Sequence, residues 1–261
     1  MIMMTVTKLW TQRELMWYWT QREIRVRYKQ SLLGIVWAIL QPAALALVFT
    51  FVFSYIAQVP SDGVPYPIFA YAALLPWTFL ATAVAMGVPS LVNHMGLITK
   101  SNFPREILPL SIVWAALLDF LFAFLIFIVM LLLFRMPLSI HVIWFPLLLI
   151  LQVALTIGVI LLGATLNVFF RDIRFIVPLL LQIWLYATPV IYPVSMVPQW
   201  LLPYYALNPM VGIIESYRAI FLHAASPAWN LLAIGTVVTL VVLCMGFVFF
   251  KRTEPLFADI I

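Results

Sequence analysis

The side chains that most often do chemistry are few and scattered in this 261-residue chain. His94, His141 and His223 fall in three separate predicted loops, so they are a poor ligand set for one metal ion. There is no glycine-rich loop ending in Gly-Lys-Ser/Thr, and no serine, histidine and acid placed to form a catalytic triad. Cys244 lies in an apolar run, where packing is a more typical role than redox chemistry. We therefore predict a non-enzymatic chain with no catalytic residue, metal or cofactor of its own.

Three cations gather where a charged segment meets an apolar one. Arg25, Arg27 and Lys29 stand within five residues, next to Tyr28 and shortly before an apolar run that lasts to about residue 57. Arginine can hold a phosphate through two parallel hydrogen bonds, so this cluster could bind a phosphate head group at a membrane surface. It could equally well anchor the chain on anionic lipid. Both interpretations stay open at the level of the sequence.

Asp119 is the only acid deep inside an apolar run. Placing a charged side chain at mid-membrane costs about 2.5–3.5 kcal/mol, so Asp119 should face protein or water. It could be a polar point on a substrate path, or a structural hydrogen-bonding group between helices. We expect it to have no cation partner and therefore to be a poor proton relay.

The overall composition is that of an integral membrane protein. Hydrophobic residues make up 66% of the chain and charged residues only 9%, whereas soluble domains carry about 25% charged residues. The net charge of +5 comes from cations that flank apolar runs, as membrane topology demands, rather than from a basic patch on a polar scaffold. We therefore expect the chain to contact a membrane and not nucleic acid.

Apolar runs of about 20 residues or more predict transmembrane helices. The first residues lack a signal-peptide pattern, so the first run is expected to act as an uncleaved insertion signal. With the amino terminus in the cytoplasm, the inner segments hold twelve Lys and Arg and the outer segments only Arg135 and Arg218. This asymmetry predicts that both termini are cytoplasmic. We predict an all-α membrane protein with six transmembrane helices near residues 33–57, 66–91, 107–134, 142–170, 175–193 and 228–250.

The segment before the first span is predicted to lie on the membrane rather than across it. Residues 5–29 place tryptophans and other apolar side chains on one helical stripe, and Arg22, Arg25 and Lys29 on another. A tryptophan-rich face beside a cationic face is typical of a helix at the membrane interface. We therefore divide the chain into an interfacial segment, 1–32, and a six-span domain, 33–261.

Residues 195–225 are apolar but broken by prolines. Asn208-Pro209 is a good helix start, an N-cap followed by proline at the first helical position. The run after it is too short to span and includes Glu215 and Arg218. We predict a re-entrant helical hairpin that dips in from the outer face.

The loop 93–106 is short and cytoplasmic in this topology. It carries Gly96 and Pro104 as helix breakers around one or two possible helical turns. By its composition it could dock on a cytosolic partner or merely connect two spans.

The chain carries five short motifs in register. They are Arg27-Tyr-Lys-Gln-Ser-Leu-Leu-Gly34 with Trp37 and Gln41-Pro42; Asn102-Phe-Pro-Arg-Glu-Ile-Leu-Pro109; Asn167-Val-Phe-Phe-Arg-Asp172; Thr188-Pro-Val-Ile-Tyr-Pro193; and Leu207-Asn-Pro209 with Arg218. Together they cover nearly the whole chain, and in this order they resemble the ABC type-2 transporter permease family. The resemblance is closest to the branch that exports polysaccharides such as O-antigen, teichoic acid and capsule.

The resemblance implies a half-transporter that works as a homodimer with two copies of a separate ATPase subunit, which would bind the ATP and Mg²⁺. It also implies a gate at the amino-terminal helix near the substrate's entry, a coupling helix in the loop 93–106, and closure of the outer side by the hairpin. The implied gate and head-group residues are Arg25, Arg27, Tyr28 and Lys29; those for ATPase coupling are Gly96, Leu97, Lys100, Phe103, Pro104, Arg105 and Glu106; those for the outer gate are Asn208, Pro209, Glu215 and Arg218.

Aromatic side chains along the spans offer flat faces on which sugar rings could stack, although such residues also serve as packing or as interface belts. Six spans alone make a narrow bundle, so a path for a sugar chain is expected between two protomers. The candidates for its lining are Trp37, Phe51, Tyr71, Trp184 and Tyr186, together with Asp119.

These features favour the membrane subunit of an ATP-driven exporter of a lipid-linked polysaccharide, located in the cytoplasmic membrane of a bacterium. An exporter of drugs or small lipids with the same fold is the first alternative. An ion-coupled carrier is the second, but it needs several coupled intramembrane charges, and no internal repeat is visible. A structural scaffold is disfavoured because the broken segment is costly unless it lines a cavity.

Overall fold

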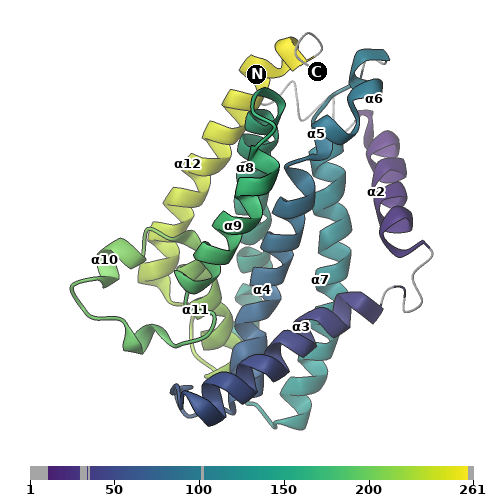
Figure 1. The fold of residues 1–261 in the computed structure, drawn as a ribbon. Helices are drawn as coiled ribbons and strands as arrows, with labels where there is room; N and C mark the ends of the chain where they lie inside the picture. Colours follow the sequence, from purple (N-terminus) through teal and green to yellow (C-terminus); the bar gives the residue numbers. More distant parts are fainter. Residues whose placement is uncertain (1–10, 30–33, 35, 101–102, 258–261) are drawn as a thin grey trace.

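The computed structural model describes residues 11–29, 34, 36–100 and 103–257, and this part of the chain is all-helical, with no strand. Figure 1 shows the long helices as a bundle, with α2 set against its flank. In chain order the elements are α2 (Arg13–Tyr28), α3 (Val36–Phe49), η1 (Thr50–Ile56), α4 (Tyr66–Gly87), α5 (Ser90–Asn93), α6 (Met95–Lys100), α7 (Ile107–Leu133), η2 (Ile140–Trp144), α8 (Phe145–Phe169), α9 (Ile173–Tyr186), η3 (Val194–Met196), α10 (Leu202–Tyr205), α11 (Pro209–Leu222), α12 (Trp229–Thr253) and η4 (Glu254–Leu256).

Five stretches of the described chain are long and apolar enough to cross a membrane. They combine α3 with η1, η2 with α8, and α12 with η4, while α4 and α7 each form one alone. The predicted class, an all-α multi-pass membrane protein, is confirmed, and these stretches match five of the six predicted spans. Their bounds are Val36–Ile56, Tyr66–Gly87, Ile107–Leu133, Ile140–Phe169 and Trp229–Leu256.

The remaining predicted span, 175–193, is only partly helical. α9 is a 14-residue helix that ends at Tyr186, so it is about 21 Å long where the hydrocarbon core is about 30 Å thick. Pro189 explains the early end. The residue before a proline is pushed out of the helical conformation, and proline itself has no amide hydrogen to donate.

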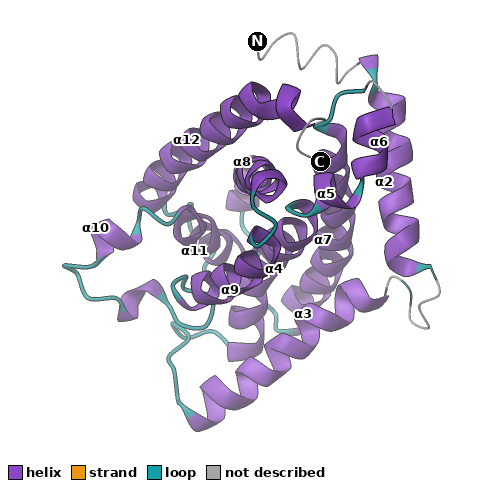
Figure 2. Ribbon diagram, turned by 45° about the horizontal axis from the view of Figure 1, so that its top comes forward, coloured by secondary structure: helices purple, strands orange, loops and turns teal. Residues whose placement is uncertain are grey.

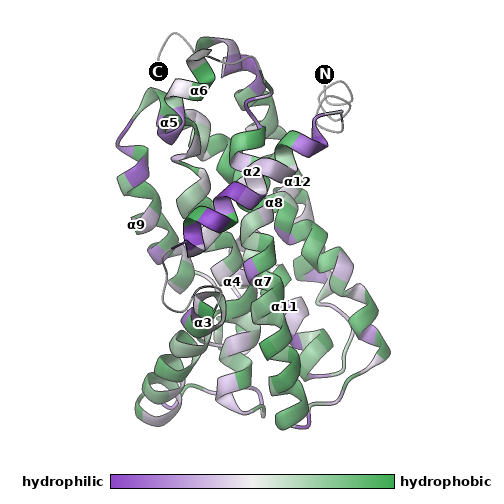
Figure 3. Cartoon of the chain, turned by 90° about the vertical axis from the view of Figure 1, so that its right-hand side faces the viewer, coloured by the Kyte–Doolittle hydropathy of each residue, from purple (hydrophilic) through white to green (hydrophobic). Residues whose placement is uncertain are grey.

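The predicted interfacial helix corresponds to α2, which lies along α7. Its buried residues are Trp19, Thr20 and Glu23, whereas Trp17 and Tyr18 are exposed. Figure 3 shows that α2 is rich in hydrophilic residues while the long helices are mostly hydrophobic. Residues 5–10 of the predicted helix, and residues 30–33 at the boundary of the first span, fall outside the described residues.

α4 is the central helix of the bundle. Of its apolar window 78% is buried, against 50% or less for the other four candidate spans. α3, α7, α8, α9 and α11 all contact it, and Figure 2 shows it near the middle of the molecule. Its sequence is apolar on every face, which is typical of a helix enclosed by others.

Residues 195–225 form η3, the single turn α10 and the 14-residue helix α11. The predicted helix start is confirmed, because Asn208 caps α11 and its side chain accepts a hydrogen bond from the Met210 amide at 3.1 Å. α11 is buried along most of its length, against α12, α4 and α8. The structure therefore has one long buried helix, α11, after the single turn α10, where a re-entrant helical hairpin was predicted.

The backbones of α8 and α12 come close together at two glycine residues. A methyl group added at Gly246 would collide with the carbonyl oxygen of Gly158, and one added at Gly158 would lie 2.8 Å from the Cα and amide nitrogen of Leu243. Helices in lipid gain little from apolar burial alone, so close backbone approach at small residues is a main source of their association. The two glycines therefore set the distance between α8 and α12.

We expect Gly246→Ala to lower the free energy of unfolding by about 1–3 kcal/mol, because the added methyl group must push the two helices apart. Thermal unfolding in detergent, followed by the loss of the monodisperse peak in size-exclusion chromatography, measures the effect. Gly96→Ala is the matched control, because no atom lies within 4 Å of the position its methyl group would take. Equal destabilisation by both substitutions would contradict this explanation.

Candidate functional site

An ion pair joins α2 to α7, one of the candidate membrane-spanning helices. Arg27 Nη1 on α2 donates to Asp119 Oδ2 on α7, and Tyr28 Oη donates to the other carboxylate oxygen at 2.5 Å. Only 13% of the Arg27 side chain and 17% of the Asp119 side chain are exposed. Where water is largely excluded, opposite charges attract each other much more strongly than at a surface. Removing one partner leaves a buried charge without compensation.

The expectation that Asp119 has no cation partner is therefore wrong. The partner comes from α2, 92 residues earlier in the chain, and not from another span. Burial raises the pKa of Tyr28 well above its usual range, and the hydrogen bond to Asp119 raises this pKa further. The phenol therefore keeps its proton and remains a donor at physiological pH. Of the two interpretations of Asp119, a structural bond between helices is the one that this contact supports.

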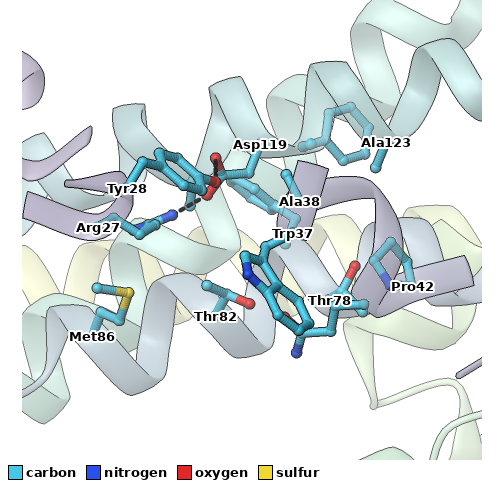
Figure 4. Close-up of a pocket in the computed structure, with 14 residues that line it drawn as sticks. Arg27, Tyr28, Trp37, Ala38, Pro42, Thr78, Thr82, Met86, Asp119 and Ala123 are labelled. Atoms are coloured by element: carbon cyan, nitrogen blue, oxygen red, sulfur yellow. Dashed lines mark hydrogen bonds and ion pairs between the residues drawn. The ribbon is translucent and has the colours of Figure 1, made fainter. Parts of the chain in front are cut away.

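The ion pair forms one wall of a cavity of about 280 Å³ between α2, α3, α4 and α7. In Figure 4, Trp37, Thr78 and Thr82 face the same space as Arg27 and Asp119. Gln41 adds a further polar group, and the rest of the lining is mostly apolar. Such a site can take a ligand that has both an anionic or hydroxylated part and an apolar part.

The two threonines were not singled out in the sequence. Thr78, Thr82 and Met86 follow one another at intervals of four residues on α4 and all line the cavity. Two polar residues four apart in an apolar run lie on one face of a helix. That spacing was the available signal for this wall of the cavity.

Arg25 and Lys29 lie apart from the ion pair. Both are exposed, and they line an open groove along α2 with Tyr18 and Gln21. The structure thus brings Arg27, Tyr28, Asp119 and Trp37 together, and leaves the other two predicted head-group cations on the surface. No group of three or more His, Cys, Asp or Glu side chains that could hold a metal ion is found among the described residues.

The other predicted lining aromatics fall into two groups. Phe51 and Tyr186 are exposed on the outside of the single chain. Tyr71 is fully buried, donates to the carbonyl of Ala123 at 3.0 Å and stacks on Phe127, which argues against its predicted contact with substrate. Trp184 also packs inward, edge-on to Trp77.

The predicted coupling loop, 93–106, contains α6 and the residues that lead into α7. Gly96 is exposed, while Leu97 and Phe103 pack against a buried cluster at this end of the bundle. Pro104 is half-buried, and the side chain of Lys100 lies outside the described part of the chain. A partner could therefore reach the outer surface of α6 around Gly96.

Arg105 and Glu106 are bound within the chain instead of facing outward. Glu106 is 1% exposed and pairs with Lys251, which also reaches Glu254 at 2.8 Å. Arg105 donates to the carbonyl oxygen of Glu254. Glu106 is thus bound by Lys251 of α12 and is not exposed to a partner in this structure, and its predicted part in ATPase coupling stays a prediction. Lys251 and Glu254 complete this cluster. In the sequence, Lys251 entered only the count of inner Lys and Arg residues, and Glu254 was not singled out.

At the other end of the bundle, Asn208 joins α9 to α11. Its Oδ1 accepts from Trp184 Nε1 at 2.9 Å, and its Nδ2 donates to Thr188 Oγ1 at 2.8 Å. Pro209 follows as the first residue of α11. One amide therefore caps α11 and holds the end of α9 against it.

Arg218 holds the turn that follows α9. It is 1% exposed, and its guanidinium donates to the carbonyls of Pro189 at 2.7 Å and Val190 at 2.9 Å. Its Cζ lies 3.6 Å from the centre of the Phe69 ring, and Glu215 is 3.9 Å away. The predicted outer-gate residues thus meet around one irregular turn, and their role in a gate stays a prediction.

Comparison with known proteins covers nearly the whole chain. Residues 14–222 match the family described as ABC-2 type transporter. The chain is 33% identical to the O-antigen export system permease protein RfbA of Myxococcus xanthus, over 95% of this chain and 96% of that protein. It is 30% identical to the protein of that name from Klebsiella pneumoniae, over 93% of each. It is 27% identical to the polysialic acid transport protein KpsM of Escherichia coli, over 84% and 86%. The chain belongs to the ABC-2 type transporter family, in its polysaccharide-export branch.

Proposed function

We propose that this chain is the permease subunit of an ATP-driven exporter that moves a lipid-linked polysaccharide across the bacterial cytoplasmic membrane. The observation that carries the proposal is the similarity to O-antigen export permeases over almost the full length of both chains. The similarity to a polysialic acid transport protein supports the same class of polymer substrate. A cavity with an arginine on one wall and an apolar lining fits a substrate with a charged head and a lipid tail.

The charge distribution supports a cytoplasmic position for the end of the bundle that holds α2, α6 and the end of α12. Most of the Lys and Arg gather there, whereas Arg135 and Arg218 belong to the opposite end. In this orientation α9 begins beside Arg171 and Arg174 on the inner side. Together with residues 187–193 it would complete a sixth crossing, so that both termini are cytoplasmic.

We propose that α11 is a re-entrant helix. Pro209 packs against Gly235, with its Cα 3.2 Å from the site of an added methyl group. Gly235 lies six residues after the first residue of α12, which is about 9 Å along a helix. A helix that starts at this depth, with its irregular approach held by protein groups, fits the conditions under which a broken segment is tolerated in a membrane.

We also propose a homodimer that works with two copies of a separate ATPase, which would bind the ATP and Mg²⁺. This chain has no Gly-x-x-x-x-Gly-Lys-Ser/Thr motif, so the energy for transport must come from a partner. The exposed surface of α6 around Gly96 is the proposed docking point, because a short loop there joins α4 to α7 through α5. Movement of α6 would then reach both spans.

Arg27 is the proposed contact for the phosphate of the lipid-linked substrate. Its Nη1 binds Asp119, while its Nε and Nη2 are buried and have no hydrogen-bond partner among the described residues. Buried donors are normally satisfied, so a ligand oxygen in the adjoining cavity would complete the set. Arg25 and Lys29, both exposed, fit the alternative role of holding anionic lipid.

We expect the chain, expressed with its own ATPase subunit in a bacterium that lacks its O-antigen permease and ATPase, to restore polymer at the cell surface. Immunoblotting of surface glycan measures the result, and a catalytically dead ATPase is the control. Restored resistance to toxic compounds without surface polymer would instead support the drug-exporter alternative.

Arg27→Gln should lower polymer export at least about tenfold, the usual minimum for losing a charge-assisted hydrogen bond. Arg25→Gln is the matched control, since it removes the same charge from the same helix but from an exposed position. Export in proteoliposomes measures both, and co-purification with the ATPase confirms assembly. Equal losses would show that these cations only anchor the helix on lipid.

Gly96→Trp should weaken co-purification of the ATPase at least about tenfold, because a bulky side chain would stand on the proposed docking surface. The substitution meets no atom within 4 Å at the Cβ position, so the fold should tolerate it. Gly96→Ala is the control that keeps the surface small. Undiminished co-purification of the tryptophan variant would place the docking surface elsewhere.

A further inference from the structure

His94 is the joint between α5 and α6. α5 ends at Asn93 and α6 begins at Met95. The carbonyl oxygen of His94 accepts from the Leu97 amide at 3.0 Å and from the Ile98 amide at 3.3 Å. These are the first hydrogen bonds of α6, so the backbone of His94 moves with that helix.

The side chain of His94 links α6 to α2. Its Nδ1 lies 2.8 Å from the carbonyl oxygen of Ser90, which can only accept, so Nδ1 carries the hydrogen. In the neutral ring Nε2 is then an acceptor, and Arg22 Nη1 lies 2.8 Å from it. His94 therefore receives a hydrogen bond from a charged donor on the interfacial helix.

Trp19 contacts both partners of this hydrogen bond. The Trp19 ring meets the His94 ring edge-on, with 5.2 Å between their centroids. The guanidinium of Arg22 lies 4.5 Å from the centre of the Trp19 ring. Trp19, Arg22 and His94 thus contact one another between α2 and the α5–α6 joint, and Arg22 Nη1 also donates to Glu23 Oε1 on its own helix at 3.1 Å.

The link lies beside the smaller of two buried clusters. Trp19 belongs to this cluster together with Leu91 of α5, Ile98 of α6 and residues of α7, α8 and α12, and the cluster is distinct from the larger one around α4. Beside the link, between α2 and the end of α4, lies a cavity of about 410 Å³. On that side α2 is not closely packed, so the position of α2 depends more strongly on the hydrogen bond between Arg22 and His94.

We propose that the Arg22–His94 hydrogen bond is a direct coupling link that positions α2 relative to α6. The inference rests on the proposed function, in which α6 receives the movement of the ATPase and Arg27 of α2 contacts the substrate. Arg22 and Arg27 are five residues apart, about 7.5 Å along one helix. A displacement of α6 is therefore transmitted through His94 and along α2 to the Arg27–Asp119 ion pair.

Two substitutions of His94 separate the link from a merely structural role. Glutamine places an oxygen at the distance of Nε2 from the backbone and keeps an acceptor for Arg22. Asparagine places an amide at the distance of Nδ1 and keeps only the donor to Ser90. Both lose the ring contact with Trp19, and they differ in which hydrogen bond they keep. A defect in the asparagine variant alone therefore assigns the effect to the bond with Arg22, because the bond to Ser90 is the one that this variant retains.

The first measurement needs no transport. Spin labels at Glu14→Cys on α2 and Gly96→Cys on α6 are placed in a Cys244→Ser background, since Cys244 is a free exposed cysteine. The chain is embedded in nanodiscs of phosphatidylethanolamine and phosphatidylglycerol without the ATPase. Electron paramagnetic resonance should give one narrow distance distribution for His94 and for His94→Gln, and a broad or shifted one for His94→Asn.

The second measurement uses the unlabelled complex with the ATPase in proteoliposomes of the same lipids. His94→Asn should lower export about tenfold while basal ATP hydrolysis stays within about twofold, and His94→Gln should export like the parent chain. Export by His94→Asn equal to that by His94→Gln, or identical distance distributions for the two, would overturn the link. If the parent chain exports no polysaccharide, the proposed function fails, and the distance measurement still decides whether Arg22 and His94 hold α2 to α6.

Discussion

The ion pair between Arg27 and Asp119 is the constraint on which the arrangement of α2 against α7 depends. A carboxylate without a partner would be costly to bury at that depth of α7. A guanidinium on α2 without a partner would likewise be costly to bury. Together they satisfy each other, with Tyr28 as a second donor to the carboxylate. Because both charges are needed, α2 must lie along α7, and this position closes the cavity that Trp37, Thr78 and Thr82 line.

The rest of the fold follows from two separate cores. The larger one surrounds α4, which is enclosed by other helices along most of its length, and close glycine contacts bring α8 and α12 together beside it. The smaller one joins Trp19 of α2 to Ile98 of α6 and Phe250 of α12. The buried contacts of α2 therefore lie in the smaller core, which also takes in residues of α7 and α8. α2 and α6 meet in this core, and the hydrogen bond between Arg22 and His94 is a direct contact between α2 and the start of α6.

The irregular segment between α9 and α11 is held in place by hydrogen bonds to polar groups of the protein. Backbone carbonyls in a broken segment need partners when lipid surrounds the protein. Arg218 donates to those of Pro189 and Val190, and Asn208 caps α11 while binding Thr188 and Trp184. These two residues stabilise a turn that would otherwise be unsatisfied. The last carbonyls of α9 have partners nearer by: the Thr188 hydroxyl donates to that of Trp184, and the Tyr192 hydroxyl to that of Tyr186.

The sequence by itself determined the membrane class, five of the spans, a helix before the first span and the start of α11, because composition, apolar run length and capping residues act locally. Only the tertiary structure decided which charges meet. Arg27 and Asp119 are 92 residues apart, and Arg22 finds His94 72 residues away. Glu106, which the family resemblance placed among the ATPase-coupling residues, is bound by Lys251 of α12. Such pairings depend on how the helices pack, so no local sequence pattern predicts them. The tertiary structure therefore turned a cationic, aromatic stretch into a helix that is held at Arg22 by His94 and at Arg27 by Asp119.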